Sequence, residues 1–339
     1  MRKPYGWNLL LLALAAVLSV AVGAVFVPPQ ALWRLLAARA GILPAPTDLP
    51  RYYATILFHL RLPHMALVAL VGAALGSSGA AYQGLFRNPL ADPYLLGVAA
   101  GAGLGAVAAL SLHWPQSLLG AYLIPVGAFA GALATVLLVT LLARVNGSLS
   151  TTALILAGVA VGSFATALTS FLMLRSEHEV RRALTYLLGG APLAGWDPVL
   201  ALLPYWVVGQ LGLLTAGHPL NVLQFGEDQA QQLGLPVARA KAQVLLAASL
   251  TTAAAVAFAG IIGFVGLIVP HLVRFLWGED YRHLIPLSLL GGASALLIMD
   301  TLARVLLAPQ ALPVGIVSAL IGAPFFLWVL RRTRRQMMW

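Results

Sequence analysis

Long apolar runs separated by short charged breaks dominate the chain. Eight stretches contain no Asp, Glu, Lys or Arg, and they lie at 4–33, 62–86, 93–143, 145–174, 198–226, 242–273, 283–299 and 305–330. A helix needs about 20 apolar residues to cross the hydrocarbon core of a bilayer. Most of these stretches are therefore predicted to hold one membrane-spanning helix each.

Two of the stretches are long enough for two helices. A turn at 113–116 divides the stretch 93–143, and glycines within 260–263 divide the stretch 242–273. The pattern predicts an all-α polytopic membrane protein in which 1–339 form a single transmembrane domain. Ten spanning helices are expected, near 7–27, 61–84, 95–112, 117–142, 150–173, 197–215, 239–259, 264–277, 284–305 and 313–331.

The basic residues predict an orientation in the membrane. An even number of spans puts both termini on one side, and the basic residues at 2–3 and 331–335 favour the cytoplasm under the positive-inside rule. With this topology 12 basic residues lie inside and 8 outside. The outer ones need an explanation of their own, and they are Arg34, Arg39, Arg51, Arg61, Arg175, Arg181, Arg182 and Arg304.

Composition excludes several classes of protein. The chain is 60% hydrophobic and 9% charged, with a mean hydropathy of +0.91, whereas soluble domains carry roughly a quarter charged residues. It has no cysteine, which excludes a thiol nucleophile and a Cys-ligated metal site. Neither lysine, Lys3 or Lys241, follows a glycine, so a Walker phosphate loop cannot form. We expect no catalytic residue, no cofactor and no metal ligand, and we attribute the net charge of +10 to membrane orientation and lipid contact, not to nucleic acid.

Two features inside the predicted spans suggest close packing and a buried charge. Glycines recur every fourth residue, as in Gly72 with Gly76 and Gly101 with Gly105, a spacing that lets helix backbones approach closely in lipid. Asp300 lies within a predicted span with Arg304 four residues later, on the same helix face. This pair is either a structural salt bridge or part of a gating or transport site.

Three breaks on the predicted inner side are unusual in composition: 86–97, 146–152 and 216–240. In the longest break, Gly226 and Gly234 bound a short polar helix, with Leu233 predicted to be exposed. From the residues alone, this segment is either a surface for a partner protein or an ordinary loop.

Several motifs resemble one known family. These are NPLADP at 88–93 followed by Leu96-Gly97, GFVGLIVPH at 263–271, LPVGIV at 312–317, GAPFF at 322–326, and RLP at 61–63. In this order they are similar to the metal-chelate permeases, the membrane subunits of ABC importers for ferric siderophores, haem and vitamin B12. The resemblance covers about 50–335.

The resemblance implies a set of partners and a location. Two permease subunits, here a homodimer, form a pore between them and bind two cytoplasmic ATPases. A periplasmic or lipid-anchored binding protein delivers the chelate. The location implied is the bacterial cytoplasmic (inner) membrane.

The resemblance also implies roles for individual residues. Asn88, Leu90, Ser150 and Thr151 match positions of the cytoplasmic gate. The segment 226–236 is similar to the coupling helices that seat in the ATPase, with Gly226, Glu227, Gln229, Leu233 and Gly234 as its candidates. Arg61, His64 and Arg304 match the surface that docks the binding protein, although the family commonly has arginine at the position of His64.

Two other functions remain open at this stage. An ion-coupled secondary transporter would act without an ATPase, and an intramembrane enzyme would need a catalytic constellation that the sequence does not show. Siderophore, haem and cobalamin permeases share all the quoted motifs, so the sequence does not select the chelate.

Overall fold

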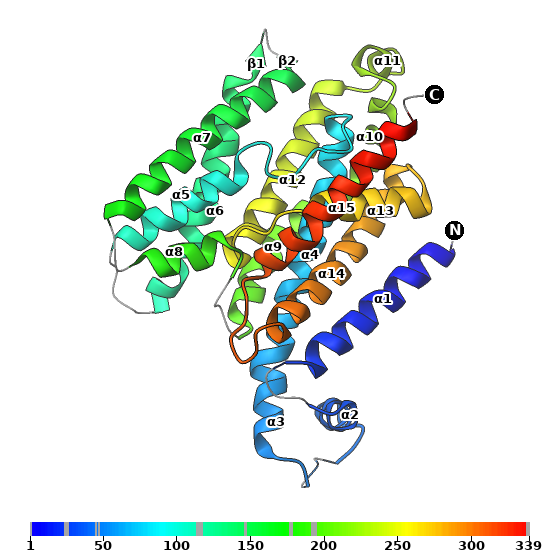
Figure 1. Cartoon of the computed structure of the whole chain (residues 1–339). Coiled ribbons are helices and arrows are strands. Elements are labelled where there is room, and N and C mark those ends of the chain that lie inside the picture. The colour runs from blue at the N-terminus through cyan, green and yellow to red at the C-terminus, as the bar shows by residue number, and fades with distance from the viewer. Residues whose placement is uncertain are drawn as a thin grey trace.

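The computed structural model describes residues 2–23, 27–44, 46, 48–112, 118–145, 148–175, 179–190 and 195–336. These residues form a bundle of helices with one short hairpin (Figure 1). The elements are α1 (Arg2–Ala21), α2 (Pro29–Arg39), α3 (Arg51–Thr55), the π-helix η1 (Ile56–Arg61), α4 (Leu62–Leu85), α5 (Val98–Ser111), α6 (Leu118–Leu142), β1 (Arg144–Val145), β2 (Ser148–Leu149), α7 (Thr151–Arg175), α8 (Val180–Leu187), α9 (Asp197–Thr215), α10 (Gly217–Leu223), α11 (Glu227–Gln232), α12 (Val237–Ala259), α13 (Val265–Trp277), α14 (Tyr281–Val305) and α15 (Val314–Gln336).

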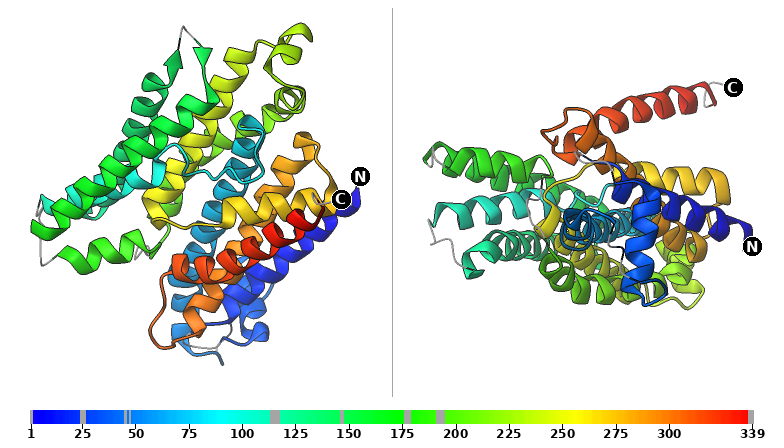
Figure 2. Two further views of the ribbon diagram at one scale, coloured as in Figure 1. Left: turned by 45° about the horizontal axis from the view of Figure 1, so that its top comes forward. Right: turned by 90° about the horizontal axis from the view of Figure 1, so that it is seen from below.

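Each of the ten predicted segments coincides with an apolar helix. Among the described residues, seven helices are long and apolar enough to cross a membrane, and α5, α13 and α15 are shorter apolar helices. Helix α1 begins and α15 ends on the same side of the bundle, away from α2 and α3 (Figures 1 and 2). The turn predicted at 113–116 lies outside the described residues.

The ends of the first two predicted spans were placed wrongly. The first helix begins at Arg2 and ends at Ala21, not at 7 and 27. The second is helical from Arg51 onward through η1 and α4, so Arg61 lies inside it and does not open it. The apolar residues before Arg61 continue the helix because they pack on the end of α1, with Leu57 fully buried there.

Helix α4 lies at the centre of the bundle and contacts α9, α12, α13 and α14. All its residues from Val71 to Leu85 are buried. A Cβ at Gly72 would overlap the carbonyl oxygen of Gly292 on α14, and one at Gly105 on α5 would overlap the carbonyl oxygen of Gly127 on α6. The predicted close approach of helices through small residues is thereby confirmed.

Polar side chains also join the central helices. The hydroxyls of Tyr82 on α4 and Ser249 on α12 lie 2.7 Å apart, and Gln210 on α9 donates to the Ser77 hydroxyl at 2.8 Å. Hydrogen bonds between helices stabilise bundles in lipid, where no hydrophobic effect drives association.

Several of the predicted outer arginines have local partners. Arg34 on α2 donates to both carboxylate oxygens of Asp48, at 2.7 and 2.6 Å, and this bidentate contact holds the pKa of the Asp48 carboxyl below its usual range. The Arg39 guanidinium lies over the Phe58 ring, 5.9 Å from its centroid. These contacts account for positive charge that the positive-inside rule does not predict.

Candidate functional site

The segment 86–97, between α4 and α5, is not helical and carries the predicted gate residues Asn88 and Leu90. Arg87 has a φ of 47°, which turns the chain away from α4. The Asn88 Oδ1 atom accepts a hydrogen bond from the Leu90 backbone N at 2.9 Å, a local turn typical of asparagine. The Leu90 side chain is 42% exposed and is therefore available to contact another molecule.

A second non-helical segment, 260–264 between α12 and α13, meets the first. The Tyr94 hydroxyl donates to the Ile262 carbonyl oxygen at 2.9 Å and accepts from the Ile262 backbone N at 3.1 Å. Irregular backbone within a membrane protein needs such partners, because lipid supplies none. Tyr94 is a residue that the sequence analysis did not single out, since its partner is distant in sequence.

A cavity of about 930 Å³ lies beside this junction, between α5 and α7. Among the described residues that line it, Asp92 is the one charged side chain, and small or hydroxyl-bearing residues dominate: Gly97, Gly158, Gly162, Ser163, Thr166 and Ser170. Thr151 is the first residue of α7, and the Ser150 Oγ atom accepts from the Ala153 N at 3.4 Å just before it. The two predicted gate segments therefore lead directly into the two helices that line the cavity.

The helix predicted between Gly226 and Gly234 is α11. The two glycines adopt φ values of 105° and 83°, and α11 occupies the residues between them. Leu233 is 68% exposed, as predicted, and Phe225 is 67% exposed. With Gln229 on α11, also exposed, they lie on this short helix and beside its two ends, and we call these three residues the coupling stripe.

The segment that carries the coupling stripe is fixed to α14. Asn221 on α10 donates to the Asp280 Oδ1 atom at 2.6 Å and accepts from the Tyr281 backbone N at 2.8 Å. Hydrogen bonds from Arg282 hold the pKa of the Asp280 carboxyl well below its usual range. The carboxylate therefore stays ionised near neutral pH and keeps α10 anchored.

The beginning of α11 also lies beside one predicted gate segment. The Arg87 Nη1 atom lies 3.4 Å from the position that a Cβ on Gly226 would occupy. A displacement of α11 would therefore act close to the turn that presents Leu90.

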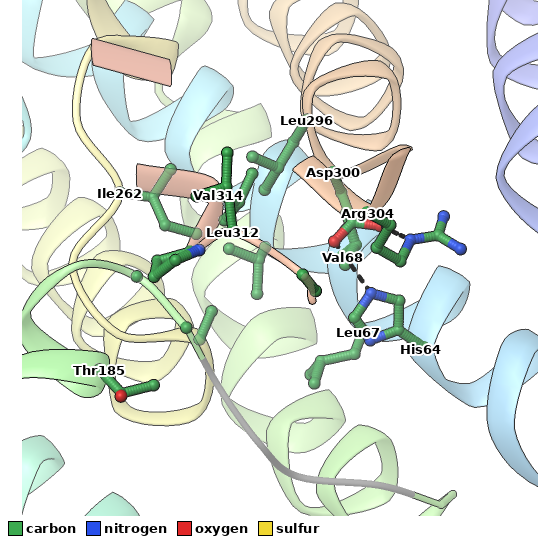
Figure 3. A pocket seen from close by; sticks show the side chains of 16 residues that line it. His64, Leu67, Val68, Thr185, Ile262, Leu296, Asp300, Arg304, Leu312 and Val314 are labelled. Carbon is green, nitrogen blue, oxygen red and sulfur yellow. Dashed lines mark hydrogen bonds and ion pairs between the residues drawn. The ribbon is translucent and has the colours of Figure 1, made fainter. Parts of the chain in front are cut away.

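Two of the predicted docking residues, His64 and Arg304, lie near one another (Figure 3). The guanidinium groups of Arg61 and Arg304 both lie close to Gly23, just after the end of α1. Asp300 on α14 joins the first two: its Oδ1 atom lies 2.9 Å from the His64 Nε2 atom and its Oδ2 atom 2.9 Å from the Arg304 Nε atom. His64, Asp300 and Arg304 line one side of a cavity of about 250 Å³ whose other walls are mostly apolar. The Asp300–Arg304 salt bridge predicted from spacing is present, and His64 is the partner that spacing did not reveal.

Both docking arginines also hold the end of α1. Arg61 donates to the carbonyl oxygens of Val20 and Ala21 at 2.6 and 3.0 Å, and Arg304 donates to those of Ser19 and Val22 at 3.0 Å each. The last carbonyls of a helix have no intrahelical partner and carry negative partial charge. The two guanidinium groups satisfy them, which explains why α1 ends at Ala21.

We expect Asp300→Asn to lower the stability of the folded protein by about 3–5 kcal/mol, because it leaves the guanidinium of Arg304 without its buried counter-charge. Asp48→Asn is the matched control, since the Arg34–Asp48 pair is exposed and such pairs contribute about 1 kcal/mol or less. Thermal unfolding of the two variants in detergent measures the difference. Equal melting temperatures would contradict a structural role for Asp300.

The overall shape and these local features can be compared with known proteins. A model of the FecCD transport family matches residues 11–332. This chain belongs to the FecCD transport family. The resemblance to metal-chelate permeases found in the motifs is confirmed, and this chain is a helical, multi-pass transport permease of the ABC type with one short β-hairpin.

Individual relatives agree with this assignment. This chain is 47% identical over 288 residues to the cobalamin import system permease of Halobacterium salinarum, and the match covers 85% of this chain and 76% of the relative. It is 39% identical over 343 residues to the hemin transport system permease of Yersinia pestis, covering 99% and 97%. A solved inward-facing metal-chelate type ABC transporter superposes with a TM-score of 0.81 at 29% identity, covering 97% of this chain and 99% of the other.

Proposed function

We propose that this chain is the permease subunit of an importer that carries a metal chelate across the bacterial inner membrane, driven by a separate cytoplasmic ATPase. The observation that carries the proposal is the coupling stripe, an exposed Phe225, Gln229 and Leu233 on a segment that is anchored to α14 and lies beside a gate segment at Gly226. Large apolar side chains exposed close together, such as Phe225 and Leu233, are typical of a surface for another protein.

Reconstitution into proteoliposomes tests this function. The permease, its ATPase and its binding protein are expected to accumulate a chelate only when ATP is supplied on the ATPase side. A panel of ferric siderophores, haem and cobalamin, offered to the binding protein first, identifies the cargo. Uptake by the permease alone down an ion gradient would instead establish the alternative, a secondary transporter that needs no ATPase.

The lining of the large cavity favours a chelate over a free metal ion. Its small and hydroxyl-bearing residues on α5 and α7 offer space and weak hydrogen bonds but no set of strong metal ligands. In a chelate the organic ligand already satisfies the metal, so a permissive wall suffices. We propose cobalamin and haem as candidate cargoes, in line with the names of the relatives, and ferric siderophores, in line with the motif resemblance.

Two copies of the chain are proposed to form the pore, with Leu90, Asn88, Ser150 and Thr151 at its cytoplasmic mouth. Since the chain lacks cysteine, Leu90→Cys introduces a single thiol. We expect it to crosslink to its twin in the closed state and to lose that reactivity when ATP opens the gate. Leu14→Cys, exposed on α1 on the other side of the bundle from α5 and α7 (Figure 1), is the control. Equal crosslinking of Leu90→Cys in all nucleotide states would make Leu90 a packing residue.

Arg61, His64 and Arg304 are proposed to mark the end of the permease that receives the binding protein. His64 is the member to substitute, because the arginines also hold α1. We expect His64→Arg to raise the association rate of the binding protein, since arginine adds a permanent cation that steers an acidic partner. Stopped-flow association at two salt concentrations measures this. An association rate that changes neither with the substitution nor with the salt concentration would contradict the docking role.

A further inference from the structure

Lys241 is the one buried lysine among the described residues. It belongs to neither the proposed gate, the coupling stripe nor the docking residues. It lies in the second turn of α12 and is 3% exposed. A lysine ammonium is rarely buried unless it is paired, so its partners show what it does. Figure 1 places the first turns of α12 between the β1–β2 hairpin and α11.

The ammonium of Lys241 joins these two elements. Its Nζ atom donates to the Leu149 carbonyl oxygen at 2.5 Å and to the Glu227 Oε1 atom at 2.8 Å. Leu149 ends β2 and immediately precedes the gate residue Ser150, and Glu227 is the first residue of α11. One side chain thus bonds the start of the coupling helix and the end of the gate hairpin.

We propose that Lys241 is a positioning residue that transmits movement of α11 to the gate at Ser150 and Thr151, an inference that rests on the proposed importer function. When an ATPase displaces α11, Glu227 moves with it, and the ammonium either follows the carboxylate or loses a partner in a buried place. Because the second option is unfavourable, the Leu149 carbonyl and the start of α7 are drawn along. Arg87 lies beside Gly226 and is proposed to transmit the same movement to the gate segment that carries Leu90.

The test uses the complete importer with a reporter thiol. In a Thr152→Cys parent, we expect the rate of maleimide labelling to differ about fivefold or more between the ATP-bound and nucleotide-free states, the scale of a typical coupling between sites. Lys241→Met, which keeps the length of the side chain and removes its charge, is expected to reduce that difference to less than about twofold while the ATPase continues to bind and hydrolyse ATP. Gln243→Met is the matched control, since Gln243 on the same helix donates to the Gly212 carbonyl oxygen on α9 at 3.1 Å and to neither element.

The conservative variant separates transmission from simple stabilisation. Lys241→Arg keeps the positive charge and the donors for Glu227 and for the Leu149 carbonyl oxygen. We expect this variant to retain the nucleotide dependence of labelling that Lys241→Met loses. Labelling in Lys241→Met that responds to nucleotide as in the parent would overturn the proposal. A parent that neither transports a chelate with ATP nor responds to nucleotide would instead overturn the importer function, and this role with it.

Discussion

Leu233→Asp is expected to abolish ATP-driven transport while the permease still inserts and folds. Leu233 is exposed at the end of α11, so a carboxylate there costs nothing in the isolated subunit. In the complex, the same carboxylate would enter an apolar contact with the ATPase. An unpaired charge in such a place costs several kcal/mol, enough to weaken binding by more than about a hundredfold.

Co-purification of the ATPase with tagged permease measures this loss, and transport in proteoliposomes should fall with it. Gln231→Asp provides the control, because it adds the same charge to the same helix away from the coupling stripe. We also expect Leu233→Met to retain binding. A Leu233→Asp permease that still holds the ATPase would show that the coupling stripe is not the contact.

Gly72→Val is expected to prevent stable folding. Any Cβ at this position overlaps the carbonyl oxygen of Gly292, and backbone cannot rotate aside as a flexible side chain can. Helices α4 and α14 would have to separate along their central contact, at a cost above the roughly 1–3 kcal/mol of ordinary overpacking. Gly6→Val in α1, where nothing lies within 4 Å of the added Cβ, controls for the β-branched residue in a helix.

Heating the detergent-purified variants and measuring the fraction that remains monodisperse by size-exclusion chromatography distinguishes the two. Gly6→Val should behave like the parent chain. Similar curves for Gly72→Val and Gly6→Val would mean that the α4–α14 contact adapts more readily than its geometry indicates.

The distribution of charge along the chain was sufficient to locate every long helix, because a helix that crosses a bilayer must be apolar along its whole length. Helix ends were less predictable. The end of α1 depends on Arg61 in the second helix and on Arg304 in α14. No sequence feature near residue 21 indicates these contacts.

In the candidate site too, the sequence predicted local features but not the contacts between distant positions. Local features were predictable: the two glycines that bracket α11 are a few residues apart, and so are Asp300 and Arg304. The contacts of His64 with Asp300, Tyr94 with Ile262 and Lys241 with Leu149 join positions far apart in the chain. A single sequence contains no signal for such pairs, since each residue alone has several ordinary explanations.

The hydrogen bonds of Tyr94 also constrain how the chain assembles during synthesis. Its partner Ile262 is separated from it by 168 positions, so the segment 86–97 emerges and enters the membrane long before its partner exists. The carbonyl groups at the end of α1 lack a partner for longer still, because Arg304 follows Val22 by 282 positions. The first half of the protein therefore stays incompletely bonded until α13 and α14 arrive, and a ribosome that stops short of them leaves an intermediate with open backbone groups for membrane quality control to recognise.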